Sequence, residues 1–392
     1  MQAERVYLDH NATAPLRPAA RAAIEQALAF PGNASSVHQE GRRARAIVET
    51  AREQVAALFG VDAKAVTFTS GATEAIATSL SPNLEIDGAQ VRFDVLLVSG
   101  VEHPAVLAGG RFAADKIEKI PVDGEGVVDP ATLDRLLAQH HAAGRRPFVS
   151  VMAANNETGV LQPIAKIAEQ VHAVGGILHS DAVQAAGRLP FDLAASGADL
   201  ISVSSHKLGG PQGAGALIAR NEDLRVPPLM RGGGQERGRR AGTENVAAIA
   251  GFGAAAEEAR KVLGSEAVRL AGLRDAAEKG VQAISREAVI LSAAVARLPN
   301  TLCFAVPGIA AETAVIAFDL EGVALSAGAA CSSGKVGPST ALAAMQAAPE
   351  IAKGAMRVSL GWSSREEDIS RFLDVWKRVY LNLSQRRRER AA

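Results

Sequence analysis

One stretch, residues 177–217, constrains the fold of this chain more than any other. Two short apolar runs, at 176–178 and 199–204, each end in a cluster of polar residues. Short apolar runs bounded by polar residues are typical of buried strands. In open α/β sheets the ligand site lies beyond the carboxyl ends of the strands. Asp181 and Lys207, which follow the two runs, are therefore predicted to point into one crevice.

A lysine beside a carboxylate in such a crevice suits a carbonyl cofactor. A lysine amine forms a Schiff base with a carbonyl once a low-dielectric site lowers its pKa. Pyridoxal phosphate needs this lysine and an acidic partner that keeps its ring nitrogen protonated. The alternative is an ordinary ion pair that joins two adjacent strands. The polar residues around Asp181 and Lys207, followed by the glycine-rich run 209–213, favour the cofactor.

Length and composition place the chain in a broad class. Its 392 residues are enough for two or three domains with a large core. The 42 basic and 42 acidic residues balance, so no global field attracts nucleic acid or an anionic membrane. No signal peptide or membrane-spanning apolar run is evident, and two cysteines indicate a reducing compartment. We expect a soluble, cytoplasmic protein.

Strand and helix patterns alternate between residues 66 and 220, which predicts right-handed βαβ units and a mostly parallel sheet. A long Ala-rich helical region follows at 244–284. A strand at 301–306 holds Cys303, which is most simply a thiol of the core. The last predicted helix runs from 366 to about 383, and the arginine-rich end after it is predicted to fray.

The residues that follow two other predicted strands also suggest chemical roles. Ser70-Gly71-Ala72-Thr73-Glu74 follows the β-branched run 66–69 and opens a helix, an arrangement that places backbone N–H groups around a phosphate. The same residues also fit an ordinary helix cap. Glu102-His103-Pro104 follows a second strand at 95–98. His103 is either a cap or an imidazole that relays protons near neutral pH.

Two residues near the carboxyl end suggest how a substrate is handled. Cys331 lies in a run of small and polar residues, 326–334, that predicts a mobile loop with an exposed, nucleophilic thiol. An incidental surface cysteine is the alternative. Arg357 enters an apolar strand, and a buried arginine needs a planar anionic partner. That partner is a carboxylate side chain or the carboxylate of a substrate.

Several of these motifs resemble one family. HSDAVQ and SVSSHKLGGPQGAGAL, together with SGATE, EHPAVL and GAACSSG, are similar to segments of the cysteine desulfurases of the NifS/IscS group, which are class V aminotransferase-like and pyridoxal phosphate-dependent. The resemblance extends from YLDHNATAP to RVSLG, nearly the whole chain. It implies an α/β protein of fold type I, with a mostly parallel central sheet flanked by helices and a smaller α+β domain. The implied domains are 15–260, and 1–14 plus 261–392.

The resemblance also implies residue roles. Cys331, Lys207 and His103 would be catalytic, with the His103 ring stacked on the cofactor. Substrate binding would fall to Asn33 and Arg357, although from spacing alone a helix-capping loop is the simpler role for Asn33. Asn155 and Gln184 would bind the cofactor's phenolic oxygen, and Asp181 its ring nitrogen. Its phosphate would be held by Ala72, Thr73, Ser204 and His206. The full cofactor-binding set is Ala72, Thr73, His103, Asn155, Asp181, Gln184, Ser204, His206, Lys207 and Thr243.

Departures from the family pattern are few. Ala34 stands where proline is usual, residues 75–77 are less polar than is common, and Gly209 replaces an aromatic residue.

The Gly- and Arg-rich segment 231–243 would suggest RNA binding on its own, but there is one short copy, interrupted by an acidic residue. In the family it crosses a dimer interface and brings a threonine, here Thr243, to the phosphate of the other subunit.

The implied reaction converts L-cysteine to L-alanine and transfers sulfur to Cys331 as a persulfide, for iron–sulfur cluster assembly. The expected partners are a second copy of the chain and an iron–sulfur scaffold or other sulfur-acceptor protein. We expect no metal of its own, although Cys331 would contact a partner's cluster transiently. A selenocysteine lyase or another β-lyase would share the cofactor residues. A non-enzymatic sulfur carrier would need Cys331 but not Lys207.

Overall fold

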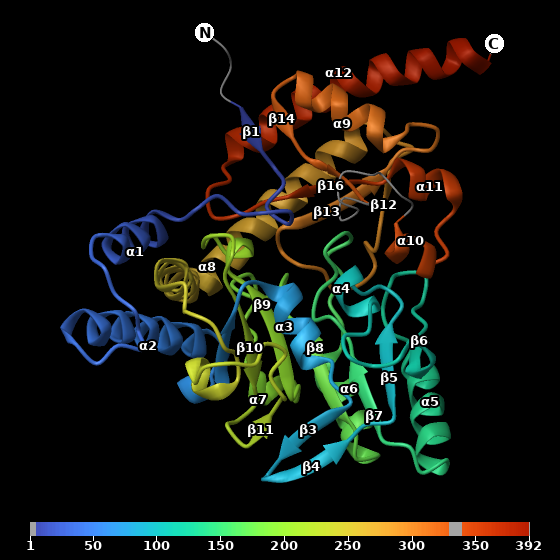
Figure 1. The fold of residues 1–392 in the computed structure, drawn as a ribbon. Coiled ribbons are helices and arrows are strands. Elements are labelled where there is room, and N and C mark those ends of the chain that lie inside the picture. Colours follow the sequence, from blue (N-terminus) through green and yellow to red (C-terminus); the bar gives the residue numbers. More distant parts are fainter. Residues whose placement is uncertain (1–4, 329–338, 392) are drawn as a thin grey trace.

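The computed structural model describes residues 5–328 and 339–391. A seven-stranded sheet is the core of the larger part of the molecule, the lower half in Figure 1. The strand order is β2-β10-β9-β8-β7-β5-β6. Only β10 is antiparallel to its neighbours, so the predicted mostly parallel sheet is confirmed. In chain order the strands are β2 Val66–Thr69, β5 Val95–Ser99, β6 Ile117–Ile120, β7 Pro147–Ser150, β8 Ile177–Asp181, β9 Leu200–Ser204 and β10 Gly215–Ala219.

Helices cover both faces of this sheet. Leu96 and Leu97 are neighbours on β5 but belong to different apolar clusters, because successive strand residues point to opposite faces. The Leu97 side packs against α2 (Gln39–Phe59), α5 (Pro130–Ala142), α6 (Ile164–Ala173) and α8 (Val246–Ile284), and α1 (Pro18–Leu28) also packs on α8. The Leu96 side packs against α3 (Ala72–Ser79) and α4 (Pro104–Leu107). Both faces are therefore buried, as the continuous apolar strands predict.

A second, smaller sheet is built from the C-terminal part of the chain. Its order is β12-β13-β16-β15, all antiparallel. The N-terminal β1 (Val6–Tyr7) pairs in parallel with β14 (Val323–Ala324), so the start of the chain joins this part of the molecule. The strands are β12 Val289–Ile290, β13 Thr301–Ala305, β15 Ser326–Ala327 and β16 Met356–Ser359. The domain boundaries given above stay a prediction.

The small sheet has an apolar core of its own. Phe304 of β13 contacts Trp376 of α12 (Glu366–Ala391), and Trp376 stacks on Phe318 of α9 (Ala311–Leu320) with ring centroids 5.9 Å apart. Leu8, just after β1, belongs to the same buried cluster. Cys303 is fully buried, which raises its pKa to about 12, and this agrees with a core thiol.

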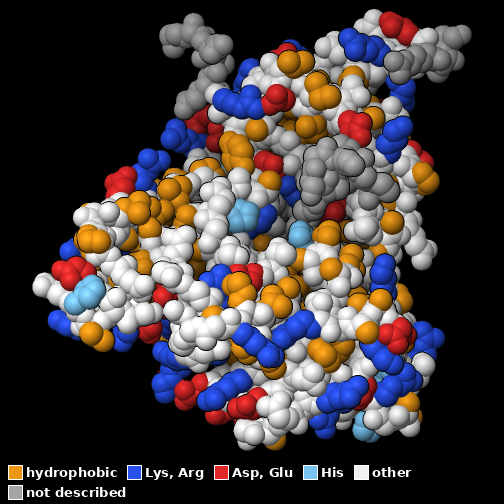
Figure 2. Space-filling model, in the orientation of Figure 1, with side chains coloured by type: hydrophobic (Ala, Val, Ile, Leu, Met, Phe, Trp, Pro, Cys, Tyr) orange, Lys and Arg blue, Asp and Glu red, His pale blue; other side chains and the backbone are white. Residues whose placement is uncertain are grey.

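Some elements differ from the sequence-based expectations. The last helix does not fray near 383 but continues to Ala391, with Arg387 bound to Glu287 and Gln385 to Glu389. The three-stranded edge sheet of β11 (Leu224–Arg225), β3 (Asn83–Ile86) and β4 (Ala89–Arg92) was not predicted. No helix in the described ranges is both long enough and apolar enough to cross a bilayer. Basic and acidic side chains are interspersed over the lower part of the face in Figure 2, as the balanced composition suggests.

The core of the small sheet provides a stability prediction. Trp376→Ala removes a side chain that is fully buried between Phe304 and Phe318, and should lower the free energy of unfolding by about 3–5 kcal/mol. Urea denaturation followed by circular dichroism measures this. Leu381→Ala, at an exposed position of the same helix, is the matched control and should change it by less than about 0.5 kcal/mol. Equal effects of the two substitutions would contradict this packing.

Candidate active site

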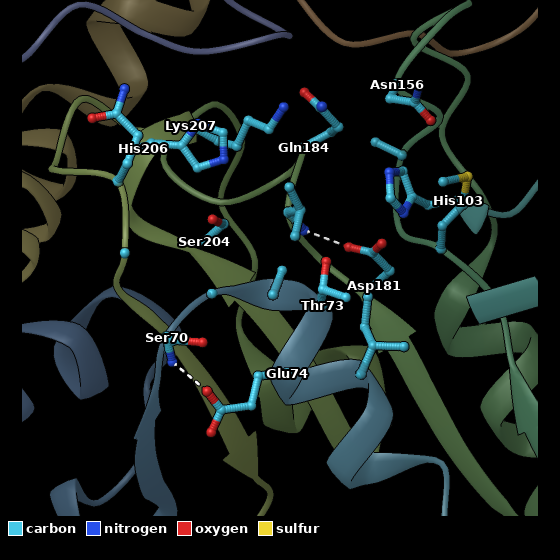
Figure 3. Close-up of a pocket in the computed structure, with 18 residues that line it drawn as sticks. Ser70, Thr73, Glu74, His103, Asn156, Asp181, Gln184, Ser204, His206 and Lys207 are labelled. Atoms are coloured by element: carbon cyan, nitrogen blue, oxygen red, sulfur yellow. Dashed lines mark hydrogen bonds between the residues drawn. The ribbon is translucent and has the colours of Figure 1, made fainter. Parts of the chain in front are cut away.

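A cavity of about 350 Å³ lies at the carboxyl ends of β8 and β9 (Figure 3). The two strands pair in parallel, with Asp181 opposite Ser202. Asp181 is the last residue of β8, and after β9 the chain enters a tight turn that ends at Lys207. Eight residues of the expected site line this cavity: Ala72, Thr73, His103, Asp181, Gln184, Ser204, His206 and Lys207.

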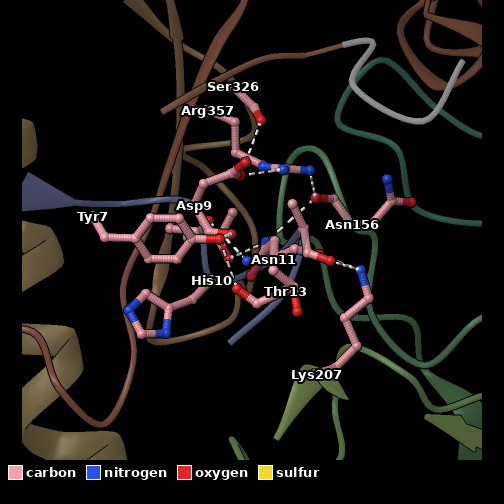
Figure 4. Close-up of polar contacts among 12 residues, drawn as sticks. Tyr7, Asp9, His10, Asn11, Thr13, Asn156, Lys207, Ser326 and Arg357 are labelled. Carbon is pink, nitrogen blue, oxygen red and sulfur yellow. Dashed lines mark hydrogen bonds and ion pairs between the residues drawn. The ribbon is translucent and has the colours of Figure 1, made fainter. Parts of the chain in front are cut away.

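The Lys207 side chain is held by the N-terminal segment (Figure 4). Its Nζ donates to the backbone carbonyl oxygens of Asn11, at 2.6 Å, and Ala12, at 2.7 Å. The Asn11 carbonyl oxygen also accepts from Nε2 of Gln184 at 3.1 Å. The amine and the Gln184 amide are therefore neighbours on one wall of the cavity.

The Asp181 carboxyl is buried, and one of its oxygens accepts a hydrogen bond from the backbone N–H of Val183 at 2.9 Å. Burial raises the pKa of Asp181 to about 6, against the opposing effects of that N–H and of the Lys207 charge. A carboxyl in this position gains most from a cationic partner inside the cavity, because such a partner favours its charged form.

One end of the cavity is formed where β2 leads into α3. Gly71 precedes the helix, and Ala72 and Thr73 supply N–H groups of its first turn, which have no partner within the helix. A side chain at Gly71 would project into open space, whereas one at Gly215 would meet the backbone of Gly71 at 2.6 Å. Backbone therefore lines this end closely, as anion binding at a helix N-terminus requires.

Glu74, also on the first turn of α3, has both of its carboxylate oxygens bound. One carboxylate oxygen accepts from the backbone N–H of Ser70 at 2.7 Å, and the other pairs with Nε of Arg240 at 2.9 Å. Its negative charge is therefore neutralised, and the helix terminus keeps its attraction for anions.

The two histidines of the cavity are both neutral near physiological pH. Nδ1 of His103 accepts from the backbone N–H of Ala105 at 3.1 Å, which assigns the ring proton to Nε2. Burial and the Lys207 charge lower the pKa of His103. Nδ1 of His206 lies 3.1 Å from Oγ1 of Thr13, and burial with the charges of Lys207 and Arg188 lowers its pKa to about 4. His103 is thus both the helix cap and a wall of the cavity.

Besides Arg357, three of the expected residues lie outside this cavity. Oδ1 of Asn155 accepts the backbone N–H groups of Glu157 and Thr158 at 2.9 Å, which closes the turn after β7, and it is Asn156 that lines the cavity. Thr243 lines a neighbouring cavity of about 210 Å³. Asn33 is exposed and its side chain accepts from the N–H of Ser35 at 2.9 Å, within the loop that leads to His38, the N-cap of α2. The functional roles of these three residues stay predictions.

Arg357 of β16 is buried and faces the N-terminal segment (Figure 4). It pairs with Asp9 at 2.7 Å and donates to the Asn156 carbonyl oxygen at 2.9 Å. The second carboxylate oxygen of Asp9 accepts from Ser326 at 2.7 Å. The carboxylate side chain that the sequence offered as an alternative partner is therefore Asp9. Cys331 lies outside the described residues.

Sequence reasoning missed one buried acid beside the cavity. Glu102 precedes His103 and is buried; Oε1 accepts from the Met152 N–H at 2.6 Å and from the Ser99 hydroxyl at 2.7 Å. Burial, to which the nearby Asp181 charge adds, raises its pKa to about 8. Near neutral pH it therefore adds little negative charge beside Asp181. The apolar strand ending at Ser99 is the only local signal for this position.

Known proteins resemble this chain in sequence and in fold. The aminotransferase class-V family model matches residues 6–372. This chain belongs to that family. A cysteine desulfurase of Cereibacter sphaeroides is 41% identical over 95% of both chains, and the cysteine desulfurase IscS of Dictyoglomus turgidum is 38% identical over 95% of this chain and 94% of its own. A NifS-like protein from Rickettsia africae superposes with a TM-score of 0.86 at 33% identity, covering 96% of this chain and 99% of its own. The resemblance to the NifS/IscS group and fold type I are confirmed.

The buried Asp181 gives a pH prediction for the cofactor-free protein. Its ordinary pKa is 3.8 and the folded value is about 6, so between these pH values the folded state binds more protons than the unfolded state. Stability then falls as the pH rises through this window. Asp181→Asn removes this loss, so the variant should gain thermal stability relative to the wild type between about pH 4 and pH 7.

The thermal unfolding midpoints of the wild type and of Asp181→Asn, each at about pH 4 and pH 7, measure this change in stability. Asp115→Asn, at an exposed position, is the control and should show no such change. A stability difference between Asp181→Asn and wild type that does not vary with pH would contradict the burial of this carboxyl.

Proposed function

We propose that this protein is a pyridoxal phosphate-dependent cysteine desulfurase that converts L-cysteine to L-alanine and takes the sulfur on Cys331 as a persulfide. The observation that carries the proposal is the placement of Lys207, Asp181 and the N-terminus of α3 on one cavity. An ion pair between adjacent strands explains less, because it requires neither a cavity of about 350 Å³ nor a helix terminus that faces it.

The residues present fit the cofactor. The amine of Lys207 matches its aldehyde, and the buried carboxyl of Asp181 matches a protonated ring nitrogen. Ala72, Thr73, Ser204 and His206 would hold the phosphate. The neutral imidazole of His103 would cover one ring face, and the Gln184 amide would donate to the phenolic oxygen. Thr243 would serve the phosphate of a second subunit, so we also propose a homodimer.

Bound in this cavity, the cofactor would act as an electron sink that weakens the substrate's bonds next to its amino group. Lys207 would move the α-proton, and Asp181 would keep the ring nitrogen protonated. The Cys331 thiolate would then attack the substrate sulfur. A sulfur–sulfur bond forms as the Cβ–S bond breaks, the electron pair stays on the substrate carbon, and proton uptake there gives alanine. His103, whose Nε2 carries a proton, is placed to relay protons.

Arg357 would hold the substrate carboxylate. Its two terminal nitrogens already bind Asp9 and the Asn156 carbonyl oxygen, while its buried Nε has no hydrogen-bond partner among the described residues. A buried donor without a partner costs about 1–3 kcal/mol. A substrate carboxylate that binds Nε would remove this cost and complete a planar fork. Asn33 would assist it.

The family implies the partners, and the low cysteine content supports the location. We propose that the persulfide supplies iron–sulfur cluster assembly through a scaffold or other acceptor protein in the cytoplasm. A selenocysteine lyase would share the whole cavity, and rates on L-cysteine and L-selenocysteine, with and without Cys331, separate the two activities. The relatives described above, which are named cysteine desulfurases, support the first.

Replacement of Cys331 tests the proposed function. Cys331→Ala should keep the cofactor's visible absorption, because the cavity residues are untouched, and should lose alanine formation from L-cysteine by at least ~100-fold, since the nucleophile is gone. Alanine release under excess reductant is the measurement. Cys303→Ala, at the chain's other cysteine, is the matched control and should retain activity. If Cys331→Ala formed alanine at the wild-type rate, the proposed role of that thiol would be wrong.

Replacement of Arg357 tests substrate binding. Arg357→Lys keeps a positive charge but loses the fork, so KM for L-cysteine should rise about tenfold or more. Cofactor affinity should stay near that of the wild type, because Arg357 does not line the cavity. Steady-state kinetics and cofactor titration measure the two effects. A variant that loses the cofactor with an unchanged KM would show that Arg357 is structural.

A further inference from the structure

Arg188 is a buried cation that the proposed reaction has not used. The residue is buried, with 7% of its surface exposed. All its hydrogen bonds go to neutral oxygens: the backbone oxygens of Gln184 at 3.0 Å, His10 at 3.1 Å and Lys207 at 3.4 Å, and the side-chain oxygen of Gln184. Within residues 5–328 and 339–391, no carboxylate lies within ion-pair distance of it.

Other buried arginines of this protein do have acidic partners. Arg52 pairs with Glu236 at 2.7 Å, and Arg357 pairs with Asp9 at the same distance. Leaving a buried charge without a counter-ion is costly, and such groups are normally paired. The positive charge of Arg188 acts on this neighbourhood, because it contributes to the lowered pKa values of His206 and His10. The described structure therefore places an unbalanced positive charge directly behind the cavity wall.

Arg188 also fixes the direction of the Gln184 amide. The oxygen and nitrogen of an amide can exchange places by rotation, and neighbouring groups decide which way it points. A guanidinium only donates, so the Gln184 oxygen must face Arg188. The amide nitrogen then faces the Asn11 carbonyl oxygen, at 3.1 Å, with one N–H, and its second N–H remains for the cavity that Gln184 lines.

The position of this N–H defines what it can bind. Gln184 and Lys207 donate to the same Asn11 carbonyl oxygen, so the amide lies beside the amine. In pyridoxal phosphate the ring hydroxyl is attached next to the aldehyde that reacts with the amine. A ligand held at Lys207 therefore brings this oxygen, which is readily ionised, close to the Gln184 amide.

We propose that Arg188 is a positioning residue that locks Gln184 with an N–H directed into the cavity, and that its charge is balanced by the phenolate oxygen of the bound cofactor. The Gln184 amide then transmits the charge: Arg188 donates to its oxygen and its nitrogen donates to the phenolate. Chained hydrogen bonds of this kind strengthen one another. This inference rests on the proposed function, because it assumes pyridoxal phosphate in the cavity.

Ligand preference separates this role from a merely structural one. The full chain, freed of cofactor, is titrated by calorimetry with pyridoxal phosphate and with 3-deoxypyridoxal phosphate, which lacks the ring hydroxyl. The wild type should prefer pyridoxal phosphate. Arg188→Met should reduce that preference about tenfold, as expected for the loss of a hydrogen bond to a charged group. Arg188→Lys, which still only donates, should restore most of it.

A double variant supplies the internal control. In Gln184→Ala the amide is absent, so adding Arg188→Met should cause no further loss of preference. If Arg188→Met fails to fold, Arg188→Gln takes its place, since glutamine keeps a donor for the His10 carbonyl oxygen but no longer fixes the amide. If Arg188→Met bound both ligands more weakly by the same factor, so that its preference for pyridoxal phosphate matched that of the wild type, the inference would be overturned.

The two hypotheses fail in different ways. A wild-type protein that binds neither ligand would refute the proposed cofactor. A wild-type protein that binds both with equal affinity would leave the cofactor in place and refute the role of Arg188.

Discussion

The parallel pairing of β8 with β9 is the constraint on which the site depends. Asp181 ends one strand, opposite Ser202 of the other, and the chain then turns within a few residues to Lys207. Because both strands are buried on both faces, a slip in their register would break two apolar layers at once. The core therefore fixes the separation of the carboxyl and the amine, and the site gains its geometry from packing that has no chemical role.

Asn11 ties the smaller sheet to this pair. Its backbone oxygen accepts from Lys207 and Gln184, while its side chain donates to Thr301 at 2.9 Å and accepts from Asn300 at 3.1 Å. One buried residue thus contacts β13 on one side and the cavity on the other. The positions of Lys207 and Arg357 are therefore coupled through the N-terminal segment, which contacts both side chains.

Features that depend on residues close together in the chain could be predicted from the sequence. Asp181 and Lys207 could be found because each follows a buried strand, and motif resemblance identified the helix start at Ala72. Partners distant in the chain could not be found in this way: no local pattern connects Arg188 with the carbonyl of His10, far away in the chain. The two adjacent asparagines after β7 show the same limit, since closure of the turn decides which of them faces the cavity. Two-residue strands such as β15 carry no periodicity at all.

The most direct test concerns the bond between Lys207 and the cofactor. The purified protein is incubated with pyridoxal phosphate, reduced with borohydride, digested and examined by mass spectrometry. We expect one reduced pyridoxal phosphate per chain, on the peptide that contains Lys207, and none in Lys207→Ala. Attachment to a different lysine, or an unmodified chain, would contradict it.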